Sequence, residues 1–337
     1  MLSRRERCRF LLAVFLSLGT FALAAEAQTF ESLWNLGNTL YGQNRFAEAA
    51  EALSHAVQLN DQDARAWGLL GLCEFETGDY AHSLQHMERA FKIGLGGDDR
   101  LEGVLRYHEG LLLAHEGEFE KAIEEYRWFV SKGVTHSQFV TALGVAALHN
   151  RQFPETIPAD GREVYLAAGK AAYLSLAGAK TEAEQAFRDL VTRYPTTPYV
   201  HYLYASFLIP IDLDSAISEM RREVEISPQS GAANGLLAWL LMLNEDFKDA
   251  APYAERAEQK SPESPISEYV YGRSLVEKGN LNEGIQHLET AEKLQPDDLM
   301  NHIALASAYT KAQRPLAARR ERQISVQLAE AANEVKP

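Results

Sequence analysis

The sequence predicts an all-α solenoid of stacked antiparallel helix pairs, and two observations support this prediction. A pattern of two amphipathic helices, 34 residues long and clearest in residues 64–97, recurs along almost the whole chain. Prolines recur at one place in this pattern, where a second helix ends and the next repeat begins. They are Pro195, Pro228, Pro262 and Pro296. Each repeat contacts mainly its neighbours in such a chain, so no further domain is required.

Residues 64–97 show how each repeat is built. Trp67 and Gly71 stand at positions 4 and 8, one turn apart on the same face of the first helix. Gly78 and Asp79 form the turn, because Gly adopts positive φ at low cost and Asp caps a following helix. Position 11 holds Glu74, whereas other copies have an apolar residue there. The second helix places small or apolar residues on one face: Ser83, Met87 and Ala90.

The small residue at position 8 marks the successive repeats. It reads Gly37, Gly71, Gly110, Gly144, Ala171, Ala205, Ala238, Gly272 and Ala306. Small residues at this position and at position 20 allow neighbouring helices to approach closely. Ala216 comes one residue early at position 20, which predicts a shorter turn in its repeat.

This pattern resembles the tetratricopeptide repeat, a helix-turn-helix unit of the same length with Trp, Leu-Gly, Tyr, Ala, Phe and Pro at set positions. The resemblance covers roughly residues 30–332 and implies a right-handed superhelical solenoid of about eight to nine repeats. We expect the repeats at about 30–63, 64–102, 103–136, 137–163, 164–197, 198–230, 231–264, 265–298 and 299–335. The fourth is degenerate and the last is a terminal cap.

Two segments interrupt the repeats. Residues 94–102 insert five positions, which predicts a longer surface loop or an extended helix start. Residues 150–163 contain Pro154 and Pro158, which forbid a regular second helix in the fourth repeat. This loop is either a hinge or a special contact surface, or it is a degenerate repeat that only joins two stacks of repeats. In the final helix, we expect Arg319, Arg320, Glu321 and Arg322 to form the polar face of a cap.

The first 27 residues have the features of a bacterial-type signal peptide. Four arginines precede an apolar run over residues 10–25, and Ala25-Glu26-Ala27 provides an A-x-A site with cleavage before Gln28. The run is short for a membrane-spanning helix, which needs about 20 residues, although an uncleaved anchor is the alternative. The sequence therefore predicts an exported protein, either periplasmic or extracellular, whose mature chain does not span the membrane.

Charge and cysteine content narrow the classes of partner. The net charge is −14, and removal of four arginines and two glutamates with the leader makes the mature chain more negative still. Such a chain is a poor ligand for nucleic acid or anionic membranes. Cys73 is the single cysteine after the leader, so no internal disulfide is available. Because Cys73 lies in an apolar helix, we expect a buried, inert thiol.

The resemblance also implies where a partner would bind. In tetratricopeptide repeat proteins the first helices line a concave groove and present positions 2, 5, 6, 9, 12 and 13 to ligands. In this sequence those positions include Trp34, Asn38, Tyr41, Phe75, Tyr107, His108, Tyr165, Tyr199, Tyr202, Trp239, Tyr269 and Arg273. Aromatic residues give large contact area at low entropic cost, which favours a protein or peptide ligand. We expect about half of these rings to pack instead against the next repeat.

The residues present argue against one subtype of groove. The clamp that binds acidic C-terminal tails of chaperones in this family uses Lys, Asn and a second Asn at set positions of adjacent repeats. Asn38 matches, but Trp34 and Leu69 replace the other two residues. This clamp is therefore not expected.

The sequence contains little that indicates catalysis. His82 and His86 lie one turn apart and could share a metal, but the spacing places no third ligand and a solvated helix face is the simpler interpretation. No H-E-x-x-H, phosphate-binding loop or G-x-S-x-G motif is present. We predict a non-catalytic binding scaffold of the cell envelope without cofactor or metal. The alternatives are a role in polysaccharide assembly or export, and a metal-dependent hydrolase; the sequence identifies neither a particular partner nor an oligomeric state.

Overall fold

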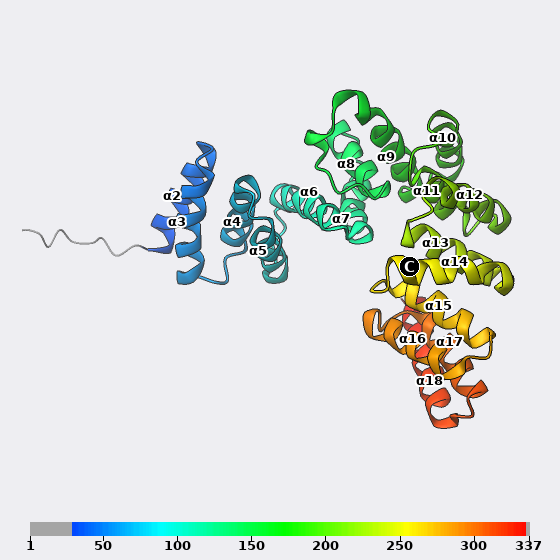
Figure 1. Cartoon of the computed structure of the whole chain (residues 1–337). Helices are drawn as coiled ribbons and strands as arrows, with labels where there is room; N and C mark the ends of the chain where they lie inside the picture. Colours follow the sequence, from blue (N-terminus) through cyan, green and yellow to red (C-terminus); the bar gives the residue numbers. More distant parts are fainter. Residues whose placement is uncertain (1–28, 335–337) are drawn as a thin grey trace, which may run out of the picture. The chain divides into compact units, whose positions relative to one another are not determined.

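The computed structural model describes residues 29–334, and Figure 1 shows that helices make up its regular structure. Across the described residues there are 17 α-helices, two short 3-10 helices and no strand. The predicted signal peptide and its cleavage site at Ala27 and Gln28 lie outside these residues. In the part that is described, no helix is both long and apolar enough to span a membrane.

The chain divides into two compact units, the first ending at Leu113 and the second beginning at Ala114. The boundary falls within helix α6. The first unit contains α2 (Phe30–Gly42), α3 (Phe46–Leu59), α4 (Ala64–Thr77), α5 (Tyr80–Ile93) and most of α6 (Asp99–Glu116). Helices α2 with α3 and α4 with α5 form antiparallel pairs, as the repeats at 30–63 and 64–97 predict.

The second unit continues the helix pairs. It contains α7 (Phe119–Ser131), α8 (Ser137–Ala147), α9 (Arg162–Leu176), α10 (Lys180–Arg193), α11 (Val200–Leu208), α12 (Leu213–Ile226), α13 (Gly231–Leu243), α14 (Phe247–Lys260), α15 (Pro265–Glu277), α16 (Leu281–Leu294), α17 (Leu299–Lys311) and α18 (Pro315–Glu334). Figure 1 shows α13/α14, α15/α16 and α17/α18 stacked in succession within this unit. The predicted fold class, an all-α solenoid of antiparallel helix pairs, is confirmed.

The turn between the two helices has the same backbone conformation in several repeats. At position 15 of these repeats the chain adopts positive φ, and Gly78 and Gly279 supply it without steric cost. Asn44, Glu245 and Gln313 adopt the same conformation at the same position despite their side chains. The turn geometry is therefore set by the packing of the helix pair, and the residue type adapts to it.

Both interruptions of the repeat have a clear structural outcome. The five extra positions after residue 94 form a short loop and an extended start of α6, which begins at Asp99 and is 18 residues long. The fourth repeat lacks a second helix: only the 3-10 helices η1 (Pro154–Thr156) and η2 (Ala159–Gly161) separate α8 from α9. The shorter turn predicted from the early Ala216 is wrong: residues 209–212 connect α11 to α12, and the missing length is lost instead from the first helix, α11, which has nine residues.

Candidate functional site

Three successive first helices of the second unit contribute side chains to one surface hollow of about 390 Å³. Trp239 comes from α13, Tyr269 and Arg273 from α15, and Met300 from α17. The rest of the lining is Met242, Leu243, Glu245 and Phe247. We call this the α13–α15–α17 hollow. It unites three of the twelve residues predicted from the sequence.

The lining of the α13–α15–α17 hollow follows the repeat register. Trp239 and Arg273 stand at position 9 and Tyr269 at position 5, while Met300 occupies position 2. Met242 and Leu243 at positions 12 and 13, like Met300, were not among the twelve predicted residues although their positions belong to the same set. Equivalent positions of stacked helices lie side by side, so the register itself is the signal that identifies them.

Arg273 is the positive charge of this hollow and is held in place by aromatic neighbours. Its guanidinium donates a hydrogen bond to the Tyr269 hydroxyl, with 3.0 Å between Nη1 and Oη, and lies 5.3 Å from the centroid of the Phe247 ring. Burial raises the pKa of Tyr269, so its hydroxyl stays neutral. Within the described residues Arg273 forms no ion pair with a carboxylate. Its remaining N–H groups can therefore donate hydrogen bonds to an anionic or carbonyl group of a ligand.

Tyr199 and Tyr202 contact each other, but they pack into the repeat stack. Their ring centroids are 5.6 Å apart, and the His149 ring is stacked 4.4 Å from that of Tyr199. The buried carboxylate of Glu223 accepts hydrogen bonds from the backbone N–H groups of Tyr199 and Tyr202, at 2.8 and 3.3 Å. A carboxylate at a helix N-terminus satisfies unpaired donors and interacts favourably with the helix dipole. Sequence reasoning missed Glu223, because its partners lie one helix away.

Most of the remaining predicted residues also contact neighbours within the stack. Trp34 lies beneath the Arg65 guanidinium, 5.4 Å from ring centroid to Cζ, and the rings of Phe75 and His108 are 4.8 Å apart. The other contacts are Tyr107 with His108, Tyr41 with Phe46, and a hydrogen bond from Asn150 to the Tyr165 hydroxyl. Asn38 is exposed. These rings contribute to packing between helices.

Position 4 has a structural role that the sequence analysis did not identify. In four repeats its side chain donates a hydrogen bond to the backbone carbonyl six residues earlier, where the preceding repeat ends. The donors are Trp67, His201, Asn234 and His302, and the acceptors Asp61, Pro195, Pro228 and Pro296, at 2.9 to 3.1 Å. These bonds tie the end of one repeat to the first helix of the next.

In three repeats position 4 also forms a His–Glu pair with position 23. His201 pairs with Glu219 at 2.5 Å and His302 with Glu321 at 2.7 Å between Nδ1 and Oε2. The repeat at 265–298 exchanges the two residue types: Glu268 stands at position 4 and pairs with His287 at 2.6 Å. The two positions therefore form the pair whichever of them carries the histidine.

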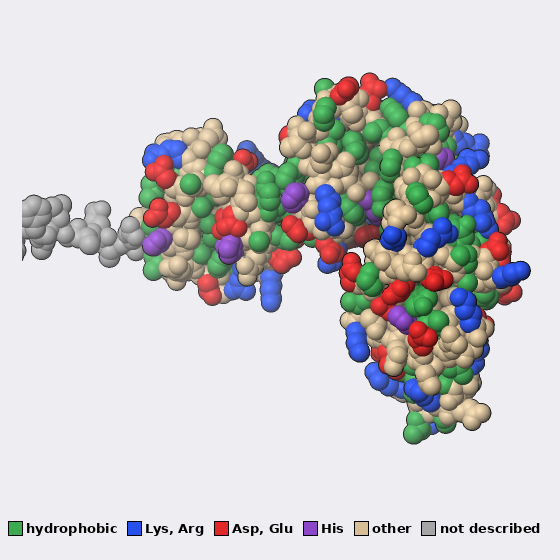
Figure 2. Space-filling view, in the orientation of Figure 1, with side chains coloured by type: hydrophobic (Ala, Val, Ile, Leu, Met, Phe, Trp, Pro, Cys, Tyr) green, Lys and Arg blue, Asp and Glu red, His purple; other side chains and the backbone are tan. Residues whose placement is uncertain are grey.

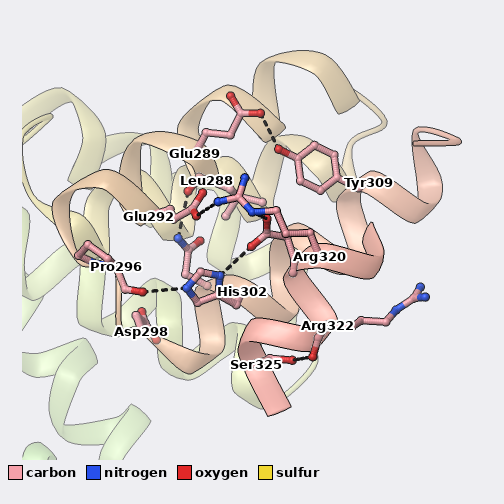
Figure 3. A network of polar contacts seen from close by, with 12 residues as sticks. Leu288, Glu289, Glu292, Pro296, Asp298, His302, Tyr309, Arg320, Arg322 and Ser325 are labelled. Atoms are coloured by element: carbon pink, nitrogen blue, oxygen red, sulfur yellow. Dashed lines mark hydrogen bonds and ion pairs between the residues drawn. The ribbon is translucent and has the colours of Figure 1, made fainter. Parts of the chain in front are cut away.

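Figure 3 shows the pair formed by His302, which corrects one prediction. Glu321 is only 2% exposed and contacts His302, so it does not belong to the polar face of the cap. Burial alone would lower the pKa of His302, but the hydrogen bonds to the Pro296 carbonyl and the Glu321 carboxylate outweigh it and raise the pKa. Both ring nitrogens face acceptors, which indicates an imidazolium.

Glu292, His302 and Glu321 also have the composition of a metal site, with ligand atoms within 4.8 Å of one another. The arrangement argues for an ion-pair cluster instead. Both nitrogens of His302 are engaged, and the Arg320 guanidinium lies 3.6 Å from Glu292 and 3.8 Å from Glu321. Side-chain cations already neutralise the carboxylates, as Figure 3 illustrates.

The other chemically notable side chains have structural partners. His82 is exposed and contacts Asp79, whereas His86 is half-buried and contacts the Glu74 carboxylate at 2.7 Å. The prediction of a solvated face is therefore wrong for His86, because the unusual Glu74 provides a partner across the repeat. Cys73 is fully buried as expected, and burial raises the pKa of its thiol to about 12.

Comparison with known proteins agrees with the architecture. A chain of stacked helix pairs with a 34-residue period is a helical-repeat protein. Models described as "Tetratricopeptide repeat" match residues 35–94, 163–197 and 212–265. Together with the helix pairs at these residues, the matches identify tetratricopeptide repeats in these parts of the chain. A search of the curated proteins found no match.

Several solved structures are similar to this chain. MamA (residues 41 to end) from Desulfovibrio magneticus RS-1 has 18% identity and a TM-score of 0.43, covering 51% of this chain and 98% of MamA. YrrB, described as a TPR protein with an unusual peptide-binding site, has 16% identity and a TM-score of 0.39, covering 49% and 89%. The APC/C hetero-tetramer Cut9-Hcn1 has 14% identity and a TM-score of 0.44, covering 98% and 88%. At these values the likeness carries no argument about function.

Proposed function

We propose that this protein is a non-catalytic scaffold that binds a protein or peptide segment in the α13–α15–α17 hollow. The tetratricopeptide repeats support a protein-interaction scaffold in general. The observation that carries the specific proposal is the convergence of Trp239, Arg273 and Met300 from three successive repeats on one hollow. The twelve positions inferred from the sequence otherwise serve mainly in packing.

The chemistry of the hollow suits a peptide. Leu243 and Met300 are 45% and 36% exposed, and they line the hollow beside the half-buried Trp239. Exposed apolar side chains gathered around an aromatic residue are typical of interaction sites. Arg273 supplies directional donors at the same place. An apolar side chain of the partner would occupy the hollow while a neighbouring carbonyl or carboxylate oxygen contacts Arg273.

We also propose that the protein acts in the cell envelope, on the basis of the N-terminal sequence. Cleavage before Gln28 would leave Thr29, the residue that caps helix α2, as the second residue of the mature chain. N-terminal sequencing of the protein purified from cell fractions tests this. The proposal expects a chain that starts at Gln28 in the periplasmic or extracellular fraction. A chain in the cytoplasm that retains Met1 would contradict it.

The binding proposal is tested by capture from the cell envelope with matched variants. The hollow variant carries Trp239→Ala and Met300→Glu. The control carries Leu316→Glu, because Leu316 is 84% exposed and lies outside the hollow. Circular dichroism and thermal unfolding establish that all three chains are folded.

The proposal expects proteins that bind the parent chain and the control but are lost with the hollow variant. Retention of the same proteins by the hollow variant would contradict it. If the material lost with the hollow variant is polysaccharide and not protein, the alternative envelope role in polysaccharide assembly or export replaces peptide binding.

A further inference from the structure

The degenerate fourth repeat brings two first helices into direct contact. A Cβ atom added at Gly144 of α8 would lie 1.8 Å from the Tyr165 carbonyl oxygen, and one added at Gly169 of α9 would lie 1.8 Å from that of Val140. The backbones therefore touch, and α9 takes the place that a second helix would occupy against α8. Figure 1 shows the two helices side by side in the second unit.

The outer side of this contact is a continuous groove. Two hollows, of about 450 and 380 Å³, lie along α8 and α9 and share Ser137 and Leu166. Together they extend along α9 from Arg162 to Leu174, which corresponds to roughly 18 Å of helix. We call this the α8–α9 groove.

The floor of the α8–α9 groove is mainly apolar and its α8 wall is small. Leu166, Tyr173 and Leu174 project from α9, and Val140 lies at the base of α8. The α8 side carries the small hydroxyl side chains of Ser137 and Thr141 together with the longer, exposed Gln138. Small residues along a helix allow another helix to approach closely.

The lining of the groove carries two basic and two acidic side chains, and they are unevenly distributed: Lys170 lies in the apolar half, and Arg162, Glu155 and Glu163 lie in the other half. Lys170 is exposed, is the one charged residue in the lining of the apolar half, and forms no ion pair among residues 29–334. In the other half, the carboxylate of Glu163 is paired with Arg193 at 2.6 Å between Oε2 and Nη2. Arg162 uses its guanidinium to hold the carbonyls of Glu155 and Ile157, which does not neutralise its charge.

The single positive charge of the apolar half contrasts with the acidic character of the chain as a whole. The whole chain has a net charge of −14, and Figure 2 shows acidic side chains interspersed with basic ones over the visible face of each unit. An apolar groove with an unpaired lysine favours a carboxylate-bearing partner and disfavours a basic one.

We propose that the α8–α9 groove is a second docking site, which binds an amphipathic α-helix of a protein partner. The helix would place apolar residues at i, i+4 and i+7 on Leu166 and Tyr173, and an Asp or Glu beside Lys170. A groove about three turns long between two parallel walls fits a helix better than an extended strand, because apolar residues spaced by helical turns cover it continuously. The site shares no residue with the α13–α15–α17 hollow, so the two sites are independent.

The test is selection from a displayed library of helical peptides of about four turns, in which the surface positions are randomised. The parent chain is the target, and the Leu166→Glu variant removes peptides that bind elsewhere. The proposal expects enriched peptides with apolar residues at i, i+4 and i+7 and with Asp or Glu at one constant position. Recovery of no peptide that depends on Leu166, or enrichment of Lys and Arg at that position, would overturn it.

Synthesised peptides then give a quantitative readout by fluorescence anisotropy. Leu166→Glu is expected to weaken binding by about thirtyfold, because a buried leucine contributes about 2 kcal/mol. Lys170→Glu is expected to weaken it by about tenfold, and a peptide with Lys in place of the acidic residue should restore much of the loss. Because Lys170 is exposed, this variant tests the site without disturbing the fold.

Two controls separate this site from the proposed hollow and from other occupants. Met300→Glu should leave peptide binding unchanged, because Met300 lines the other hollow. Lys180→Glu, an exposed lysine at the start of α10, should also have no effect. Peptides that bind equally well with a proline at their centre would be extended and would overturn the helix assignment. If the Leu166→Glu change abolishes self-association of the chain and no peptide depends on it, the occupant is a second copy and the proposal fails.

Discussion

The stacked ring of His149 leads to a prediction about acid stability. His149 follows α8 and lies between Phe119, with centroids 4.5 Å apart, and Tyr199, at 4.4 Å. Burial lowers the pKa of His149 from 6.5 to about 4. The Glu120 carboxylate is 4.0 Å from Nε2 but is largely exposed, so solvent screens its attraction for an imidazolium.

The magnitude follows from linkage between protonation and folding. The folded state binds the proton less tightly than the unfolded state, so the stability contribution is present above pH 6.5 and is lost as the pH falls toward 4. A shift of 2.5 pKa units corresponds to about 3 kcal/mol once the pH is below both values. Between about pH 7 and pH 5 the loss is about 2 kcal/mol.

The perturbation is His149→Phe, which keeps an aromatic ring in the stack and removes the titrating group. Because His149 has positive φ, where Phe is less favourable, the variant will carry an offset that does not depend on pH. The assay is urea unfolding of both chains at about pH 7 and pH 5. The pH-dependent loss in the parent should exceed that in the variant by about 2 kcal/mol, while all other titrating groups cancel in the comparison.

The reasoning is refuted if both chains lose stability in parallel. A direct check is the NMR titration of the His149 ring in the folded protein. A midpoint near 6.5 would show that water reaches the ring and that the stack does not exclude the charged form. A Glu120→Gln variant should change the titration little, because the Glu120 carboxylate is exposed to solvent.

Three further predictions concern the packing of the repeats. Gly169→Ala should destabilise the fold by about 3 kcal/mol or more, because its Cβ would overlap a carbonyl oxygen. Gly161→Ala should be tolerated, because its Cβ would be 3.6 Å from the nearest atom. Thermal unfolding of both variants checks this prediction. His302→Ala should lower the free energy of unfolding by about 3 to 5 kcal/mol, because it leaves the Glu321 carboxylate buried without its cation. If the unpaired carboxylate is the cause, adding Glu321→Leu to the same chain should restore most of the lost stability. The pKa values of His201 and His302 are raised in the folded state, so their contribution to the free energy of unfolding is complete below pH 6.5 and is lost as the pH rises through the folded pKa. The unfolding free energies of the parent and His302→Ala should therefore converge at alkaline pH. A difference between them that stays constant with pH would contradict the assignment.

The sequence predicted the architecture because helix pairing in this fold is a local, periodic property. The small residue at position 8, the turn near Gly78 and the helix-ending prolines each act within one or two repeats. Prolines 154 and 158 correctly predicted the loss of a second helix. Their consequence was not predictable, because the direct packing of α8 on α9 depends on Gly144 and Gly169 facing each other across that gap.

The candidate site was predictable only in part. The repeat register identified Trp239, Tyr269 and Arg273, but did not distinguish them from Tyr199 and Tyr202, which do not line the hollow and contact His149 instead. The difference arises from His149 and Glu223, which contact these tyrosines from other helices. His–Glu pairing between positions 4 and 23 was present in the sequence as a spacing of 18 or 19 residues, but its reversal at Glu268 and His287 concealed the pattern.

Site-specific photo-crosslinking in cells tests the central claim of a peptide-binding hollow most directly. A photoreactive amino acid is placed at Met300 in the hollow and, in a separate chain, at Leu316, which is more exposed but lies outside it. Peptide binding in the hollow predicts protein adducts from position 300 that are absent from position 316 and disappear when Trp239→Ala is added. Identical adducts from both positions, or adducts at 300 that persist with Trp239→Ala, would contradict it.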